Sequence, residues 1–323
     1  MSSKFQRIVD QSFQLQELTT EEFKKLLEAF GENVGRRLTA SLGEDPDLVF
    51  APDGSDGRRT GKTEFERLLQ SVRGADAVRA VVMAAGVDVI EDFVEASGTG
   101  AAREAVRDAV AKLAGLAEKS LVAQGVAAAG ALDTVAAEAL IGSYVTNTLD
   151  ESLKAAVDKQ AAVKIRQGII ANMGQMTVSE LAQQIGEEQK LSVNRAGTEA
   201  RTQLAAADRF VNDVTRKSVD PSGEKLLLAY LGPDDKITRP FCDHLVNKAF
   251  NVKDFDKLRN GQTSAHPRVM GGGWNCRHDV RAVIDDKQIL RDLGLTKGGM
   301  SDVNKANEAA RARKKKKKRR KKR

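Results

Sequence analysis

Apolar residues recur every three or four positions through most of the first two thirds of the chain, a spacing typical of amphipathic α-helices. In residues 5–40 this spacing accompanies a capping-box pattern, Thr19-Thr20-Glu21-Glu22, and predicts an amphipathic helix that needs a packing partner. Residues 43–61 are rich in Gly, Pro, Asp and Ser and are expected to form an exposed loop. No proline occurs between Pro52 and Pro221, and the abundant alanine of that stretch favours a long helical region.

Two more helices are predicted ahead of Lys217. Thr177-Val178-Ser179-Glu180 has the form of a second capping box, and an apolar stripe runs from Val193 to Val214 at helical spacing. The sequence contains no repeat of fixed period, which disfavours a solenoid. The first two thirds of the chain are therefore predicted to be helical.

Residues 218–275 have a different composition, because they contain four of the six prolines and most of the turn dipeptides. Leu226–Leu231 is predicted to be a buried strand and Val280–Ile284 an alternating one. The predicted fold class is mostly α, with a long Ala-rich helical region followed by a small α+β domain with a Cys/His cluster and a disordered basic C-terminal tail. The expected segments are an N-terminal helix with an exposed loop (1–60), the Ala-rich helical region (61–175), the α+β domain (176–285), a polar connector (286–312) and the basic tail (313–323).

Composition refines this picture. Hydrophobic residues make up 41% of the 323 residues but aromatic ones only 4%, so the core must consist mostly of Ala, Leu, Val and Ile. The formal net charge is +7, and eleven positive charges belong to residues 313–323, which leaves −4 on the rest of the chain. A run of like charges repels itself and is typical of a flexible appendage that binds polyanions.

Two cysteines do not make a disulfide framework, and the N-terminus lacks the apolar core of a signal peptide. We therefore expect residence in a reducing cytosol. The most apolar stretch, Leu121–Val145, contains Asp133 and Glu138 and falls short of a transmembrane helix. Membrane insertion is not expected.

Both cysteines, all three histidines and the only tryptophan lie within Cys242–His278. Cys242 and His244, like Cys276 and His278, are two residues apart, and on extended strands such pairs point to one face. Two neighbouring strands could present these four side chains to a structural zinc ion, with His266 as a substitute ligand. Structural zinc sites usually have two to four intervening residues, so the spacing supports metal and non-metal interpretations equally.

The alternatives are buried thiols, or a disulfide outside the cytosol, with hydrogen-bonded histidines. A Cys/His nucleophile oriented by Asp234, Asp235 or Asp243 is less well supported, because no protease or hydrolase signature surrounds either cysteine. Gly271-Gly272-Gly273 lacks the Lys-Ser/Thr of a phosphate-binding loop and is predicted to be a turn. No catalytic residue is predicted.

Residues 177–284 resemble the phage Mu F-like head morphogenesis family, also called minor head or minor capsid proteins. The segment Arg195–Thr202 looks like the family's Arg-Ala-x-x-x-Ala-Arg-Thr helix, Asp235–Cys242 like its Asp-x-x-Thr-x-x-x-Cys box, and His266-Pro267 with Cys276-Arg277 like its ending. The residues that carry the resemblance are Arg195, Arg201, Thr202, Asp235, Thr238, Cys242, His266, Cys276 and Arg277. The family's final Cys-Arg-Cys reads Cys276-Arg277-His278 here, which keeps a metal ligand but not a second thiol.

The resemblance implies a non-enzymatic structural protein of the virion, in the head interior or at the portal vertex, assembled in the host cytoplasm. Its expected partner is the portal or the major capsid protein, and no small-molecule substrate is expected. The basic run would contact packaged DNA without reading its sequence. It consists of Arg313, Lys314, Lys315, Lys316, Lys317, Lys318, Arg319, Arg320, Lys321, Lys322 and Arg323.

Two alternatives remain open at this point. A metal-dependent enzyme could act on nucleic acid or peptide through the Cys/His domain, if three ligands held the ion and left a fourth position free. An internal protein ejected with the DNA could rearrange its Ala/Gly-rich helices at a host membrane.

Overall fold

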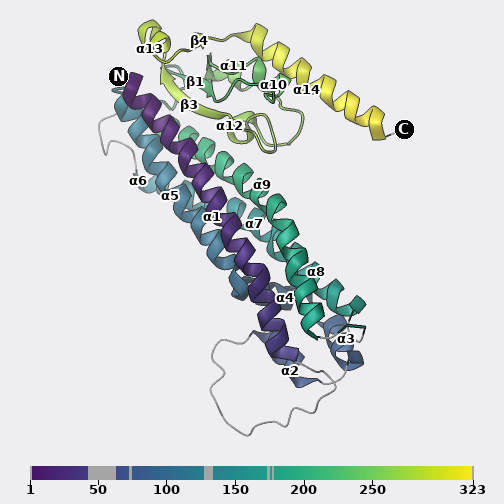
Figure 1. Ribbon diagram of the computed structural model, residues 1–323. Helices are drawn as coiled ribbons and strands as arrows, with labels where there is room; N and C mark the ends of the chain where they lie inside the picture. Colours follow the sequence, from purple (N-terminus) through teal and green to yellow (C-terminus); the bar gives the residue numbers. More distant parts are fainter. Residues whose placement is uncertain are drawn as a thin grey trace. The chain divides into compact units, whose positions relative to one another are not determined.

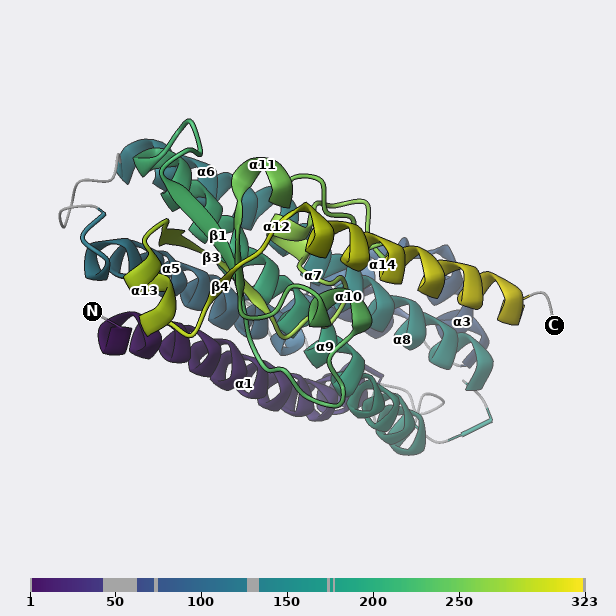
Figure 2. The ribbon, with the colours of Figure 1, turned by 90° about the horizontal axis from the view of Figure 1, so that it is seen from above.

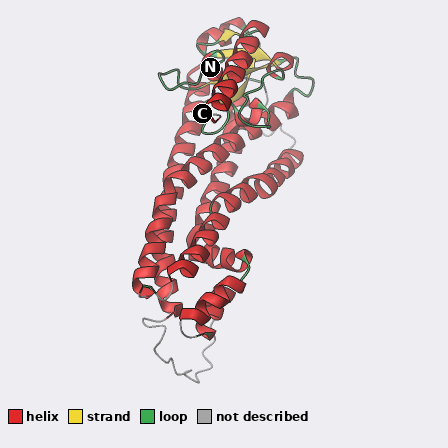
Figure 3. Ribbon diagram, turned by 90° about the vertical axis from the view of Figure 1, so that its right-hand side faces the viewer, coloured by secondary structure: helices red, strands yellow, loops and turns green. Residues whose placement is uncertain are grey.

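The computed structural model describes residues 2–42, 63–72, 75–126, 134–172, 175–176 and 178–321. It confirms the predicted fold class of a mostly helical N-terminal region followed by a small α+β region with a four-stranded mixed sheet (Figures 1 and 3). The helical elements of the first part are α1 (Ser2–Leu42), α2 (Glu64–Ser71), α3 (Ala75–Ala84), α4 (Val87–Val94), η1 (Glu95–Thr99), α5 (Gly100–Ala123), α6 (Thr134–Tyr144), η2 (Val145–Asp150), α7 (Glu151–Ala156), α8 (Asp158–Asn172) and α9 (Val178–Val219). Within η1 the chain kinks at Gly98, whose φ is +133°.

The elements of the C-terminal part are β1 (Leu226–Leu231), α10 (Pro240–Asp243), β2 (Lys248–Asn251), α11 (Val252–Phe255), α12 (Pro267–Met270), β3 (Asp279–Ile284), α13 (Lys287–Asp292), β4 (Thr296–Lys297) and α14 (Met300–Lys321). Both predicted strands are confirmed, β1 with the predicted bounds and β3 one residue longer.

The chain forms two compact units, each assembled from segments that are distant in the sequence. The α+β unit comprises Met1–Thr19, Arg107–Leu149 and Glu199–Arg323, and the helical unit comprises Thr20–Val106 and Asp150–Thr198. These units do not coincide with the contiguous segments expected from the sequence. The helical unit has its own core, in which Phe65 and Phe93 meet edge to face among Val, Leu and Ile side chains.

The capping box predicted at Thr19–Glu22 is wrong, because α1 is continuous from Ser2 to Leu42 and both threonines are buried inside it. The apolar spacing begins well before Thr19, at Phe5 and Val9, so no helix starts there. A complete capping box occurs instead at the start of α2. The side chain of Thr63 accepts the backbone N–H of Glu66, and the side chain of Glu66 accepts the backbone N–H of Thr63. The second predicted box begins at Thr177, which lies outside the described residues.

The sheet has the strand order β3-β1-β2-β4, with β1 antiparallel to both neighbours and β4 parallel to β2. Both faces of the sheet are covered, which explains why β1 is an unbroken apolar run. Leu228 and Tyr230 face a core shared with α10, α11 and α14. Leu227 and Ala229 face the opposite core, to which Phe5 of α1 contributes.

The stretch expected to be a polar connector contains α13, β4 and the first half of α14. Helix α14 packs against α10 and α11 through Val303, Ala306 and Ala310 (Figures 1 and 2). Its backbone stays helical to Lys321, within the basic run, where the sequence analysis expected disorder. The packed first turns provide the helix nucleus, and Lys and Arg extend a helix readily. From Lys314 onward the side chains lie outside the described residues.

Candidate metal centre

Cys242, Cys276 and His278 are brought together in the α+β unit, all three buried and with ligand atoms within 4.8 Å of one another. Cys242 lies in the single turn of α10, which Pro240 opens at a position where its missing N–H costs nothing. Cys276 and His278 lie on the short segment between the glycine turn and β3. The two sulfur atoms are 4.0 Å apart, and Cys276 Sγ is 3.7 Å from His278 Nδ1. Such a Cys2His group could hold a metal ion.

The glycine turn after α12 makes this approach possible. Gly271 and Gly273 have φ angles of +50° and +98°, in the left-handed region that favours glycine. A Cβ atom on Gly272 would lie 2.3 Å from Cys242 Sγ, so no larger residue fits there without displacing the thiol. The backbone N–H of Gly272 donates a hydrogen bond to Cys276 Sγ at 3.1 Å. The predicted turn is therefore confirmed, and it supplies a hydrogen bond to one candidate ligand.

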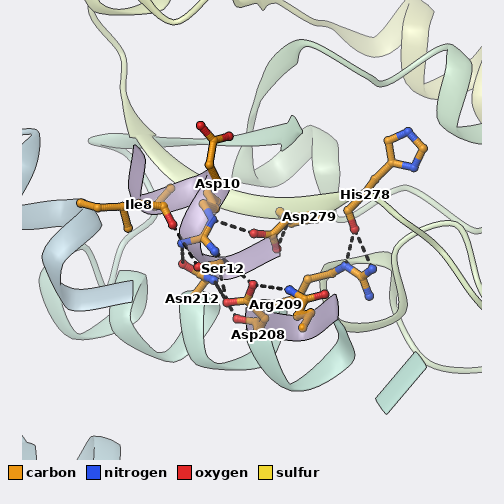
Figure 4. Close-up of polar contacts among 12 residues, drawn as sticks. Ile8, Asp10, Ser12, Asp208, Arg209, Asn212, His278 and Asp279 are labelled. Carbon is orange, nitrogen blue, oxygen red and sulfur yellow. Dashed lines mark hydrogen bonds and ion pairs between the residues drawn. The ribbon is translucent and has the colours of Figure 1, made fainter. Parts of the chain in front are cut away.

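Arg209 of α9 holds the same segment from the other side. Its buried guanidinium donates to the carbonyl oxygens of Val269, Cys276 and His278 at distances of 2.6–3.1 Å. Figure 4 shows the His278 carbonyl facing Arg209 while the imidazole ring points away from it. One side chain thereby fixes the backbone of two candidate ligands.

The imidazole of His278 is oriented by the loop after β1. Nε2 lies 2.9 Å from the carbonyl oxygen of Pro233. A carbonyl can only accept, so Nε2 carries a proton, and in the neutral ring the lone pair belongs to Nδ1, which faces Cys276. That is the tautomer a metal ligand requires.

The hydrogen bond between the two thiols shifts their pKa values in opposite directions. The hydrogen bond from Cys242 lowers the pKa of Cys276, and the same bond raises the pKa of Cys242. Cys276 is therefore the thiol that ionises first, and its negative charge then opposes the ionisation of Cys242. A divalent cation would remove this opposition, because it attracts both thiolates.

His244 and His266 are not part of the group. The expectation that Cys242 and His244 share a strand face is wrong, because α10 is helical and side chains two positions apart on a helix point in different directions. His266 instead caps α12, accepting the N–H of Arg268 at Nδ1 (3.1 Å), while its Nε2 donates to the Asp256 carbonyl (3.0 Å). Both nitrogens of His266 are thus used.

Both cysteines are free thiols here, not a disulfide.

Several residues of the sequence motif support this loop. Arg277 donates both Nη atoms to the carboxylate of Asp235, at 2.8 and 2.7 Å, and this bidentate contact lowers the pKa of Asp235. The Thr238 hydroxyl donates to the Pro233 carbonyl at 3.0 Å. Thr202 of α9 accepts the N–H of Asn275, whose φ is +53°.

The other motif residues have less defined roles. Arg201 is half-buried on α9, and the side chain of Arg195 lies outside the described residues. Trp274, which lies in the same segment of the sequence as the cysteines and histidines, is exposed.

Sequence reasoning missed the aromatic residue that is at the site, Tyr230. Its fully buried hydroxyl lies 3.3 Å from Cys242 Sγ and 3.5 Å from Cys276 Sγ, and its ring stacks on His278 at a centroid distance of 5.2 Å. Burial raises the pKa of Tyr230 well above its ordinary value. The available signal was a phenol inside a strand predicted to be buried, since a buried hydroxyl needs a partner.

A second buried polar group lies on the opposite face of the sheet, between β3 and α9. The fully buried Arg281 donates to Asp279 at 2.6 Å and to Asp208 at 3.0 Å. Gln16 of α1 donates to the same Asp208 carboxylate at 2.8 Å, and burial raises the pKa of Asp208 to about 7. Figure 4 shows Asp208 and Asp279 from different elements converging here. The network joins α1, α9 and β3.

The chain was compared with protein-family models, curated proteins and solved structures, and none of these matches it. Among the described residues, no helix is both long and apolar enough to cross a membrane. Part of the apolar stretch Leu121–Val145 lies outside those residues.

Proposed function

We propose that this chain is a non-enzymatic minor head protein of a phage, in which a structural zinc ion held by Cys242, Cys276 and His278 fixes the loops of the α+β unit. The observation that carries the proposal is the use made of the motif residues. Asp235, Thr238, Arg277 and Thr202 bind one another or the backbone around the Cys2His group. Contacts of this kind are those of residues that position a loop.

The zinc assignment follows from the donor set. Two thiolates and one imidazole favour zinc over the hard cations Mg²⁺ and Ca²⁺, which prefer oxygen ligands. The N–H bond from Gly272 to Cys276 and the Pro233 carbonyl on His278 are the kind of outer contacts that orient metal ligands. All three ligands are nearly inaccessible, with exposed fractions of 1%, 5% and 4%. A substrate could not reach the ion without displacing protein, which disfavours the metal-dependent enzyme.

The head assignment predicts that the chain is present in purified, DNA-filled phage heads and binds isolated portal or major capsid protein. Mass spectrometry of gradient-purified heads tests the first statement, with a cytosolic enzyme of the infected host as a contamination control. Absence of the chain from heads, or presence only at the level of that control, contradicts the proposal.

The basic run is proposed to bind DNA without sequence preference. Deleting residues 313–323 should abolish salt-sensitive binding to duplex DNA, because it removes eleven positive charges and leaves a chain of net charge −4. If all eleven met phosphates, the logarithm of the binding constant would fall with the logarithm of salt concentration with a slope of about −10. The fold should persist, since Val303, Ala306 and Ala310 lie before the deletion.

The matched control for this deletion keeps the same eleven residues in scrambled order. It should bind duplexes of any sequence as tightly as the natural chain does, because charge and not order carries the contact. Filter binding at several salt concentrations measures all three proteins. Undiminished binding by the deletion variant would remove the DNA role.

A further inference from the structure

We propose that Tyr230 supplies the fourth ligand, its phenolate oxygen, to the metal ion held by Cys242, Cys276 and His278. This inference rests on the zinc binding proposed above and makes the site a closed, four-coordinate one. It adds an oxygen donor from β1, a residue that lies outside the Cys242–His278 segment.

Distances between the donor atoms carry the inference. In a tetrahedral site with Zn–S bonds of about 2.3 Å and Zn–N or Zn–O bonds of about 2.0–2.1 Å, neighbouring ligand atoms lie roughly 3.5–3.8 Å apart. The two sulfurs are 4.0 Å apart, and Cys276 Sγ is 3.7 Å from His278 Nδ1. The Tyr230 hydroxyl is 3.3 Å from one sulfur and 3.5 Å from the other. The phenol oxygen thus lies at a ligand-to-ligand distance from both sulfurs.

The surroundings of the hydroxyl point the same way. Tyr230 is fully buried, and the two thiols are the hydrogen-bond partners that the structure gives its oxygen. Sulfur is a weak acceptor and a thiol a weak donor, so this is a poor set of partners for a buried phenol. Bulk water has little access to the fourth position either, because Cys242 and Cys276 are also buried. A protein oxygen already in place is therefore the simplest fourth donor.

The protein can also accommodate the net charge of the proposed zinc site. Zinc with two thiolates, one phenolate and a neutral imidazole carries a single net negative charge. Two cations, Arg209 and Arg239, lie beside this loop. The guanidinium groups donate to backbone carbonyls of the same loop, Arg209 to Cys276 and Arg239 to Gly272. These fixed cations stabilise an anionic site in a region of low dielectric constant.

The binding step balances without any redox change. As Zn²⁺ enters, the O–H bond of Tyr230 breaks, its proton goes to solvent, and the oxygen electron pair forms the new bond to the metal. Thiols that are still protonated lose their protons in the same way. A lone pair of His278 Nδ1 completes the set, with no proton released there.

The test is an ultraviolet difference spectrum during zinc titration of metal-free full-length chain at neutral pH. The chain has only two tyrosines, Tyr144 and Tyr230, so the Tyr144→Phe variant isolates the residue of interest. Tyr144 stacks on Phe210 at a centroid distance of 4.3 Å, a contact that phenylalanine can keep, and it is not one of the four proposed ligands. We expect one tyrosinate signal per zinc in the wild type and in Tyr144→Phe, and none in Tyr230→Phe.

Zinc affinity is measured in parallel by competition with a chromophoric chelator. Tyr230→Phe should bind zinc at least about 10-fold more weakly than Tyr144→Phe. Stoichiometric zinc binding by Tyr144→Phe without a tyrosinate signal would overturn the phenolate ligand but leave zinc binding in place. Failure of the wild type to compete with the chelator would overturn zinc binding itself, and with it the inference. The decisive spectrum is that of Tyr144→Phe, so it does not depend on how well Tyr230→Phe folds.

Discussion

Replacing Cys276 by serine is expected to lower the unfolding free energy of the α+β unit by about 4 kcal/mol when free zinc is present at roughly 1,000 times its dissociation constant. The reason is that zinc then no longer stabilises the folded state over the unfolded one. The only tryptophan, Trp274, lies two residues before Cys276 and reports on this loop directly. Denaturant titration followed by tryptophan fluorescence measures the loss.

A chelator separates the metal from the side chain. It should destabilise the wild type by nearly the same amount and leave Cys276→Ser unchanged. With chelator present, the two proteins should differ by no more than about 1 kcal/mol, which reflects the lost N–H to sulfur bond from Gly272. A wild type whose unfolding is indifferent to the chelator would show that the cluster is not a metal site under these conditions.

Replacing Arg281 by methionine is expected to destabilise the same unit by about 3–5 kcal/mol, because it leaves two buried carboxylates without their cation. The deficit should grow as pH rises. Burial already raises the pKa of Asp208, and Arg281 opposes that rise, so without Arg281 the pKa climbs further. A carboxyl whose folded pKa is raised stabilises the fold while protonated, and this stability is lost as pH rises through the folded pKa.

Lys297→Met is the matched control, since Lys297 pairs with Asp285 at 2.6 Å but both side chains are largely exposed, at 50% and 38%. Exposed pairs of this kind contribute at most about 1 kcal/mol. Urea unfolding of both variants at several pH values makes the comparison. Equal losses for the two variants would mean that the Arg281 network does not act as a buried unit.

The fold could be predicted to the extent that periodicity along the chain decides it. β1 could be predicted because both faces of the sheet are covered, which makes Leu226–Leu231 apolar throughout. β3 could be predicted because apolar and polar residues alternate along it. Thr19 failed as a helix start, because a capping pattern inside a continuing apolar stripe does not break a helix. Such local signals depend on what precedes them in the chain.

The site was only partly predictable, because ligand sets are assembled from residues that tertiary structure brings together. Clustering in the sequence identified Cys242, Cys276 and His278, which the structure brings together. It also included His244, because the spacing was interpreted as a strand and α10 is a helix. It could not include Tyr230, which reaches the thiols only because β1 pairs with β3 and lies against α10. Spacing identifies neighbours along the chain, whereas Tyr230 comes from β1, outside the Cys242–His278 segment.

The most direct test of the account is the metal content of the purified chain, measured by elemental analysis beside the Cys242→Ser/Cys276→Ser double variant. We predict one zinc per chain in the wild type and none in the double variant, whose α+β unit should also unfold at a lower temperature. Wild-type protein that contains no zinc, and takes up none when the ion is supplied under reducing conditions, would contradict the metal centre.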